Sequence, residues 1–308
     1  MTALHDPILT LDGVAVSVRQ RSNAPLQLVS DVSYAVAEGE CLAVVGESGS
    51  GKSITAMAIA GLLENNMTVT GSIRYKGQEL TNLRPKARRA LAGTEIGFIF
   101  QEAMSALHPL LSIKDQMIRP IRLHQKVSAR AAEARAAELL DKVGIPPARN
   151  VLNSYVHQLS GGLRQRVMIA MALSNSPRLV IADEPTTALD AAVQGQIMEL
   201  LDELRRSDNL AMILISHDIS VVARHSDNIA VMYGGQVLET GPTKAVMDDA
   251  QHPYTRALIE VARALSRDQR RLPTVPSFQN SSAPDAQEMI DLGNNRRVRP
   301  YEPAGASA

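Results

Sequence analysis

The chain has 308 residues, 45% of them apolar and 21% charged, a composition typical of globular proteins. Its 32 basic residues balance 32 acidic ones, so no net field favours nucleic acid or anionic lipid as a partner. The chain has a single cysteine, Cys41, which excludes an intramolecular disulfide. We find neither a signal peptide nor a run of about 18 apolar residues that could span a membrane.

Four short apolar runs predict buried strands that alternate with helical segments. They are CLAVV (41–45), IGFIF (96–100), LVIA (179–182) and AMILIS (211–216). Continuous apolar runs of this length are typical of strands covered on both faces, as in a parallel sheet. We therefore expect an α/β fold.

Residues 102–178, between the second and third of these runs, are helical in pattern and rich in alanine. Ser128 can cap a helix over ARAAEARAAELLDKV, which Gly144 and Pro146 would end. One face of that helix carries Ala132, Ala136, Leu140 and Val143. The pattern predicts a helical insertion between two strands of the sheet.

The C-terminal part begins with IAVMYGGQVLETG (229–241), which predicts a hairpin around Gly234-Gly235. A helical stretch follows from about 242. From about 273 the chain is rich in Pro, Ser, Asn and Ala, and we expect this tail to be weakly ordered. Its basic segment NNRRVRP (294–300) could contact a partner, although a solvated tail is the simpler expectation.

The segment GESGSGKS (46–53) matches the phosphate-loop pattern G-x-x-x-x-G-K-[ST] between a predicted strand and a predicted helix. Gly46 and Gly51 let the backbone wrap with its N–H groups inward. Lys52 can reach the β- and γ-phosphates, and the Ser53 hydroxyl can bind Mg²⁺. The other residues that we expect in contact with nucleotide are Glu47, Ser48, Gly49, Ser50 and Ile54.

Acidic residues follow the third predicted strand in LVIADEP (179–185). Asp183 can hold the hydration shell of Mg²⁺, and Glu184 can orient or deprotonate an attacking water. The alternative is that the two acids only cap the next helix.

Gln101 and His217 each stand directly after a predicted strand. In an open α/β sheet that edge faces the ligand crevice, so Gln101 could contact Mg²⁺ or water and His217 a γ-phosphate. A surface glutamine and a structural histidine are the alternatives.

A second anion site of different design occurs at LSGGLRQRV (159–167), where Ser160, Gly161 and Gly162 precede a helix. It offers a hydroxyl, unhindered N–H groups and a helix dipole, but no cation.

The chain resembles the ATPase subunits of ABC transporters over about residues 8–262. The residues that carry this resemblance are 46–53, Gln101, LSGG at 159–162, DE at 183–184, ALD at 188–190 and His217. The resemblance implies a P-loop NTPase (RecA-like) core with an antiparallel β subdomain. It implies a nucleotide-binding domain at 1–241 with a helical subdomain at about 102–178. Residues 242–308 would form an extension that is partly flexible from about 273.

The resemblance also implies roles. Catalysis would involve Glu184, His217, Gln101 and Lys52. ATP would bind residues 46–54, and Mg²⁺ would bind Ser53, Gln101 and Asp183. Two such domains pack head to tail in the family, so that Ser160, Gly161 and Gly162 would serve the ATP held by the partner. Asp190 would also be a nucleotide-binding residue.

Within that family, the chain resembles the D-type ATPase of the dipeptide, oligopeptide and nickel uptake group. Four segments carry this resemblance: GESGSGKS, LSGGLRQRVMIAMAL, IADEPTTALD and HPYTRAL (252–258). This implies an F-type ATPase partner, two membrane permeases and an extracytoplasmic substrate-binding protein. The chain would lie peripherally on the cytoplasmic face of the inner membrane. QEAMSALHPLLSI (101–113) resembles the stretch that receives the coupling helices of the permeases.

The sequence departs from the group at three places. Val18 and Arg19 stand where an aromatic residue commonly stacks on adenine, and His108 replaces a frequent asparagine. No cysteine follows Cys41, which excludes the cysteine cluster of some D-type relatives.

The transported solute stays open among peptides, nickel, opines and oligosaccharides. Alternatives for the whole chain are a soluble ABC ATPase acting on nucleic acid or ribosomes, a non-catalytic ATP-binding subunit and an exporter. The single ATPase unit and the neutral charge argue against nucleic acid as a partner.

Overall fold

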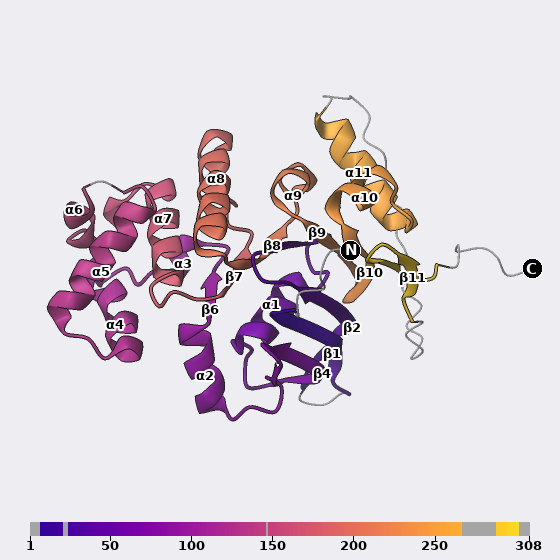
Figure 1. Ribbon diagram of the computed structural model, residues 1–308, viewed down its shortest axis with the longest axis horizontal. Helices are drawn as coiled ribbons and strands as arrows, with labels where there is room; N and C mark the ends of the chain where they lie inside the picture. The colour runs from indigo at the N-terminus through magenta and orange to yellow at the C-terminus, as the bar shows by residue number, and fades with distance from the viewer. Residues whose placement is uncertain (1–6, 21–23, 146, 267–287, 302–308) are drawn as a thin grey trace, which may run out of the picture. The chain divides into compact units, whose positions relative to one another are not determined.

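The computed structural model describes residues 7–20, 24–145, 147–266 and 288–301 (Figure 1). The chain divides into two units. Unit 1 comprises Met1–Asn82 and Leu214–Ala308, and unit 2 comprises Leu83–Ile213. The division falls within the buried strand β8 (Ala211–Ser216).

Unit 1 contains an antiparallel sheet in the order β2-β1-β4-β5. Its strands are β1 (Leu9–Val18), β2 (Leu26–Val36), β4 (Met67–Tyr75) and β5 (Gln78–Glu79). Leu9 pairs with Val36 on one side and with Tyr75 on the other. Alternate residues of these strands are buried, so one face of the sheet packs on the core of the unit.

A second sheet of unit 1 holds the strand that leads into the phosphate loop. That strand, β3 (Cys41–Val45), is buried throughout and pairs in parallel with β9 (Asn228–Tyr233). Strand β10 (Gln236–Pro242) continues antiparallel from β9, which confirms the hairpin predicted around Gly234-Gly235. The order within unit 1 is β11-β12-β10-β9-β3.

The last two strands of that sheet come from the C-terminal segment. Strands β11 (Ile290–Gly293) and β12 (Arg296–Val298) form a hairpin, and β12 pairs with β10. Asn294 and Asn295 turn the chain with φ of 53° and 61°, as primed hairpin turns require. The expectation of a solvated tail is therefore wrong for residues 288–301, while residues 273–287 lie outside the described part of the chain.

The helices of unit 1 are α1 (Lys52–Ala60), α9 (Ile219–His225), α10 (Thr243–Asp248) and α11 (Pro253–Ser266). A core cluster joins helices and sheet: Val222, Val246 and Tyr254 pack with buried residues of β3 and β9. Residues after 241 therefore share the core of the strand that precedes the phosphate loop.

Unit 2 contains the parallel strands β6 (Ile96–Ile99) and β7 (Leu179–Asp183), with Ile96 opposite Leu179. Seven helices and one 3₁₀ turn belong to its described part: α2 (Pro85–Thr94), α3 (Ala103–Ala106), α4 (Ile113–Gln125), α5 (Ala129–Lys142), α6 (Ala148–Leu152), η1 (Val156–Gln158), α7 (Gly161–Ala172) and α8 (Ala191–Asp208) (Figure 1).

Helix α5 illustrates how the local sequence determines the insertion. The Ser128 hydroxyl accepts a hydrogen bond from the Ala131 N–H and caps the helix. The face predicted to be apolar is buried, and Gly144 follows with φ of 74°. The predicted start and buried face of this helix are confirmed; Pro146 lies outside the described residues.

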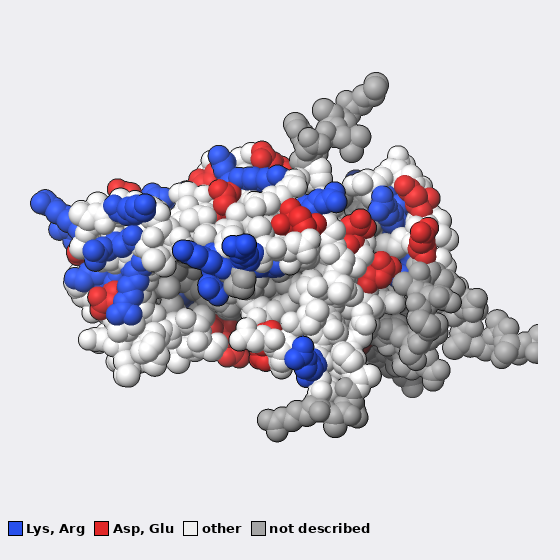
Figure 2. Space-filling view, turned by 90° about the horizontal axis from the view of Figure 1, so that it is seen from below, with Lys and Arg blue, Asp and Glu red and all other residues white. Residues whose placement is uncertain are grey.

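Charged groups on the helices of unit 2 are partly paired. Figure 2 shows Lys and Arg gathered over these helices at the left of the view, with Asp and Glu among them. Lys142 Nζ lies 2.7 Å from Asp208 Oδ1, and Lys114 lies 3.8 Å from Glu133. Exposed pairs of this kind contribute about 0–1 kcal/mol each. Among the described residues, no helix is long and apolar enough to cross a membrane.

Candidate functional site

The loop 46–53 joins β3 to α1 in a conformation that its glycines permit. Gly46 has φ of 149°, and a Cβ there would overlap the carbonyl oxygen of Met232. Gly49 has φ of 80° with open space beside it. Gly51 caps α1 in the left-handed conformation. The loop thus packs closely against β9 at one end and is open at its tip.

The Lys52 ammonium is held inside this loop. Lys52 is buried, and its Nζ donates to Gly46 O at 2.8 Å, Glu47 O at 2.7 Å and Ser50 Oγ at 3.3 Å. These contacts come from the loop itself, so the ammonium is positioned by the backbone that surrounds it.

The N-terminus of α1 suits an anion. The first turn of α1 contains no acidic residue, and Gly51 provides no side-chain cap for the N–H groups there. A buried ammonium, the positive end of a helix and an open glycine tip together fit the phosphates of a nucleotide.

In unit 2, Glu184 follows β7 and its carboxylate is oriented by two donors. Gln101 Nε2 and Thr187 Oγ1 each donate to Glu184 Oε2 at 2.9 Å. Glu184 has φ of 46°, an uncommon conformation for a residue other than glycine. The next helix, α8, is capped by Asp190, and Glu184 instead takes part in a side-chain cluster that includes Gln101.

Asp183 is the last residue of β7 and is buried. Gln101 follows β6, the parallel neighbour of β7, by two residues. The ends of adjacent parallel strands thus bring Gln101 and the pair Asp183-Glu184 to one edge of the sheet. Sequence reasoning missed Thr187, although a threonine three residues after Glu184 is within reach of its carboxylate.

The segment 160–162 begins α7 and lies beside the start of α8. The Ser160 hydroxyl accepts the Leu163 N–H at 3.4 Å. A Cβ at Gly161 would lie 3.3 Å from Leu189 Cδ2, and one at Gly162 would lie 2.9 Å from Val193 Cγ1. Asp190 caps α8 by accepting the N–H groups of Ala192 and Val193. The structure therefore places Asp190 next to the predicted signature segment.

His217 and Arg19 lie in unit 1. His217 is exposed directly after β8, before Asp218, which caps α9. Arg19 is exposed and follows β1, and its N–H donates to Asn66 O at 2.9 Å. Of the predicted site residues, unit 1 carries 46–54 and His217, and unit 2 carries the remainder.

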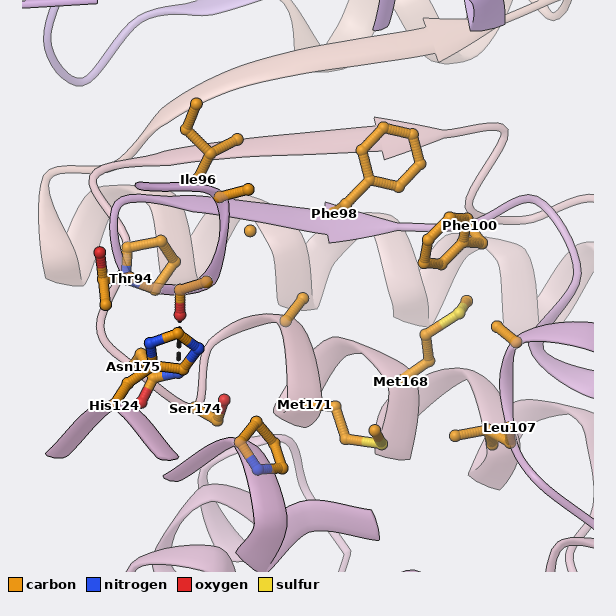
Figure 3. Close-up of a pocket in the computed structure, with 17 residues that line it drawn as sticks. Thr94, Ile96, Phe98, Phe100, Leu107, His124, Met168, Met171, Ser174 and Asn175 are labelled. Carbon is orange, nitrogen blue, oxygen red and sulfur yellow. Dashed lines mark hydrogen bonds between the residues drawn. The ribbon is translucent and has the colours of Figure 1, made fainter. Parts of the chain in front are cut away.

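Unit 2 also contains a cavity of about 230 Å³ near Gln101 in sequence. Figure 3 shows Phe98 and Phe100 on one side of it and Met168 and Met171 of α7 on the other. Leu107 and Pro120 complete an apolar lining. Phe100 is 42% exposed, so an aromatic ring of this lining is accessible from outside.

The far end of the cavity is polar and tightly packed. Asn175 Nδ2 donates to Gly93 O at 2.7 Å, the dashed bond in Figure 3. A Cβ at Gly93 would overlap the His124 ring. The apolar lining therefore lies at the Phe100 end of the cavity and the polar groups at the His124 end.

The fold and these residues define a nucleotide-binding ATPase cassette. The sequence model described as ABC transporter matches residues 29–187. The chain belongs to this family and is an ATP-binding cassette ATPase.

Similar proteins agree with this assignment. The dipeptide transport ATP-binding protein DppD of Escherichia coli (strain K12) is 43% identical over 270 residues, which cover 87% of this chain and 82% of that protein. DppD of Haemophilus influenzae is 43% identical over 249 residues, 80% of this chain and 76% of that protein. A dimeric post-hydrolysis structure of the cassette MJ0796 with ADP and Pi has a TM-score of 0.68 and 28% identity, over 76% of this chain and 98% of that chain.

Proposed function

We propose that this chain is the ATP-hydrolysing subunit of a bacterial ABC importer that takes up dipeptides or related small peptides. Hydrolysis would open a closed pair of ATPase subunits, and partner permeases would convert that opening into transport. The substrate class is supported by the relatives that are dipeptide transport proteins, DppD of two organisms. The chemical step is supported by the contacts within the chain.

One observation carries the hydrolytic role: the Glu184 carboxylate is oriented by Gln101 and Thr187 at 2.9 Å each. A general base must be held so that it accepts the proton of an attacking water. We assign this role to Glu184, with Gln101 and Thr187 as the residues that orient it. His217 would contact the γ-phosphate.

Residues 46–54 would bind the phosphates of ATP. The N–H groups at the start of α1 point to where an anion would lie, and Lys52 is already desolvated beside them. Lys52 would keep its hydrogen bond to Gly46 O and exchange its other loop contacts for phosphate oxygens. Binding would cost little conformational freedom, because the ammonium is already held in position.

Ser53, Gln101 and Asp183 provide the hydroxyl, amide and carboxylate oxygens that Mg²⁺ prefers. Mg²⁺ would supply charge neutralisation on the phosphoryl group during transfer. Asp183 would contribute its carboxylate from the end of β7, and Ser53 would present its hydroxyl from the first turn of α1.

A second ATPase subunit would complete the site. Ser160, Gly161 and Gly162 offer a hydroxyl and backbone N–H groups at the start of α7 but no cation. We assign them, with Asp190, to the nucleotide held by the partner. An F-type relative is the partner that the D-type resemblance implies.

The cavity beside Phe98, Phe100 and Met171 would receive a coupling helix of a permease. Its apolar lining and the exposed ring of Phe100 suit an apolar side chain of such a helix. The chain would accordingly lie peripherally on the cytoplasmic face of the membrane, with two permeases and an extracytoplasmic substrate-binding protein. Residues 1–241 would form the nucleotide-binding domain and 242–308 its extension.

The Glu184→Gln substitution tests the hydrolytic role. We expect phosphate release to fall at least about a hundredfold while Mg–ATP binding is retained, because the amide cannot accept the proton. Glu203→Gln on the exposed face of α8 is the matched control. Normal turnover in Glu184→Gln would contradict the assignment.

The importer assignment is tested by recovering tagged Glu184→Gln protein from native membranes with Mg–ATP. We expect a second ATPase and two permeases, whose identification allows reconstitution and uptake measurements with labelled dipeptide. Recovery of nucleic acid or ribosomes without permeases would instead support the soluble ATPase alternative.

A further inference from the structure

Tyr254, in the HPYTRAL segment, connects the C-terminal extension to the phosphate loop. It is the second residue of α11 and is fully buried. Its hydroxyl accepts a hydrogen bond of 3.2 Å from the backbone N–H of Glu47. Residues 207 positions apart in sequence are thereby joined within unit 1.

The Glu47 N–H belongs to the peptide group that joins Gly46 to Glu47. The carbonyl oxygen of that same peptide group, Gly46 O, accepts from Lys52 Nζ at 2.8 Å. Because a trans peptide is planar, its N–H and C=O point in opposite directions. A partner that fixes the N–H therefore fixes the carbonyl that holds the Lys52 ammonium.

Gly46 limits how this peptide group can move. Its Cα approaches the carbonyl of Met232 so closely that no Cβ fits there. Glu47 O, on the next peptide group, also accepts from Lys52 Nζ. With the Gly46 end packed against β9, rotation of the peptide plane is the remaining freedom, and Tyr254 opposes it.

Tyr254 is itself held by a buried polar network. Its backbone N–H donates to His252 Nδ1 at 3.1 Å, and the His252 N–H donates to Glu239 Oε2 at 3.0 Å. Glu239 is fully buried and also accepts from Arg296 of β12. The Tyr254 ring packs against Tyr233, with centroids 4.6 Å apart. The hydroxyl therefore has a fixed position.

We propose that Tyr254 is a positioning residue for the phosphate loop, which orients the Gly46–Glu47 peptide and through it the Lys52 ammonium. This inference rests on the proposed role of Lys52 in phosphate binding. Tyr254 touches no substrate; it acts by keeping the ammonium in the position that phosphate requires. Burial raises the pKa of Tyr254 to about 12, so the hydroxyl stays protonated in the physiological range.

Calorimetric titration of the full chain with Mg–ADP tests this inference without turnover. We expect Tyr254→Phe to weaken binding about two- to tenfold, the effect of one intramolecular hydrogen bond. Tyr75→Phe is the matched control, since Tyr75 is also buried in unit 1 but lies on β4 outside this network. Tyr75→Phe should bind like the unsubstituted protein.

A double-substitution cycle separates positioning from a general structural role. In the Lys52→Ala background, Tyr254→Phe should have no further effect on Mg–ADP affinity, because the group it positions is gone. Additive losses, or an affinity of Tyr254→Phe equal to that of the control, would overturn the inference. If Lys52→Ala alone left the affinity unchanged, the proposed role of Lys52 would fail, and with it this inference.

Discussion

Gln101 Nε2 donates a 2.9 Å hydrogen bond to Glu184 Oε2 across the ends of two adjacent parallel strands. Removing this donor in Gln101→Ala should reduce the rate of ATP hydrolysis about tenfold or more, because a hydrogen bond to a charged group contributes about 1.5–3 kcal/mol. Mg–ATP binding should fall less than turnover. Phosphate-release kinetics measure the difference, and Gln196→Ala on the exposed face of α8 is the control.

Gly46 and Gly49 of the phosphate loop differ in the space that a side chain would have there. Gly46→Ala should lower the free energy of unfolding by about 3 kcal/mol or more, because the new Cβ overlaps the Met232 carbonyl. Gly49→Ala faces open space, so only its positive φ costs stability, about 1–2 kcal/mol. Denaturant titration of both variants compares them; equal losses would contradict the packing at Gly46.

His252 should make stability depend on pH. Burial, with the nearby Arg299 charge, lowers the pKa of His252 to about 4 from 6.5. The unfolded chain then binds more protons than the native one between these values, so the free energy of unfolding should fall as pH drops from about 6.5 towards 4. His252→Asn keeps an acceptor near Nδ1 and should flatten this part of the stability profile. Burial raises the pKa of Glu79, but hydrogen bonds from Ser72, Thr81 and Ile73 outweigh it and lower the pKa from 4.5 to about 2, so the stability that Glu79 contributes is lost as pH falls from about 4.5 towards 2.

Arg299 ties the C-terminal segment to β2. Its buried guanidinium donates to Asp31 Oδ2 and to Val237 O, each at 2.9 Å. Arg299→Ala should lower the free energy of unfolding by about 2–3 kcal/mol, because Asp31 loses a charged partner. Arg297→Ala removes an exposed cation from β12, two residues before Arg299, and should change the free energy of unfolding by less than about 0.5 kcal/mol. Thermal unfolding of the pair measures this.

Phe100 should matter for partners rather than for hydrolysis. Phe100→Ser removes the exposed aromatic ring from the lining of the cavity in Figure 3. We expect permease recovery from membranes to fall several-fold, while basal ATP hydrolysis by the isolated subunit stays near normal. Leu123→Ser, a change of another exposed apolar residue in unit 2, is the control. Equal recovery of both variants would exclude the cavity as a docking site.

The residues that carry strong local signals were predictable from sequence. The strands at 41–45, 179–182 and 211–216 are continuous apolar runs, and the structure buries each one. The cap at Ser128 follows from local chemistry and is confirmed. The position of Gln101 at a strand end was also predicted. Its hydrogen bond to Glu184 could not be predicted without knowing that β6 pairs with β7.

Other features depend on contacts that no local pattern encodes. Strand β1 carries shifts of register against β2 and β4 between residues 11 and 17 that interrupt its alternation, so sequence reasoning expected this sheet only through the family resemblance. The hairpin β11-β12 was missed because β12 pairs with β10, a strand that lies far from it in the sequence. The contact of Tyr254 with Glu47 joins segments that are far apart along the chain, and neither motif alone predicts it.

The bond between Arg299 and Asp31 spans 268 positions, which has a consequence for biosynthesis. At about 5–20 residues per second, a ribosome needs about 15–50 s to make the second partner after the first. During that interval the phosphate loop has been translated, but the strands and helix that fix it have not. The contiguous unit 2 is translated entirely within this interval, so the first segment of unit 1, Met1–Asn82, waits longest for its partners.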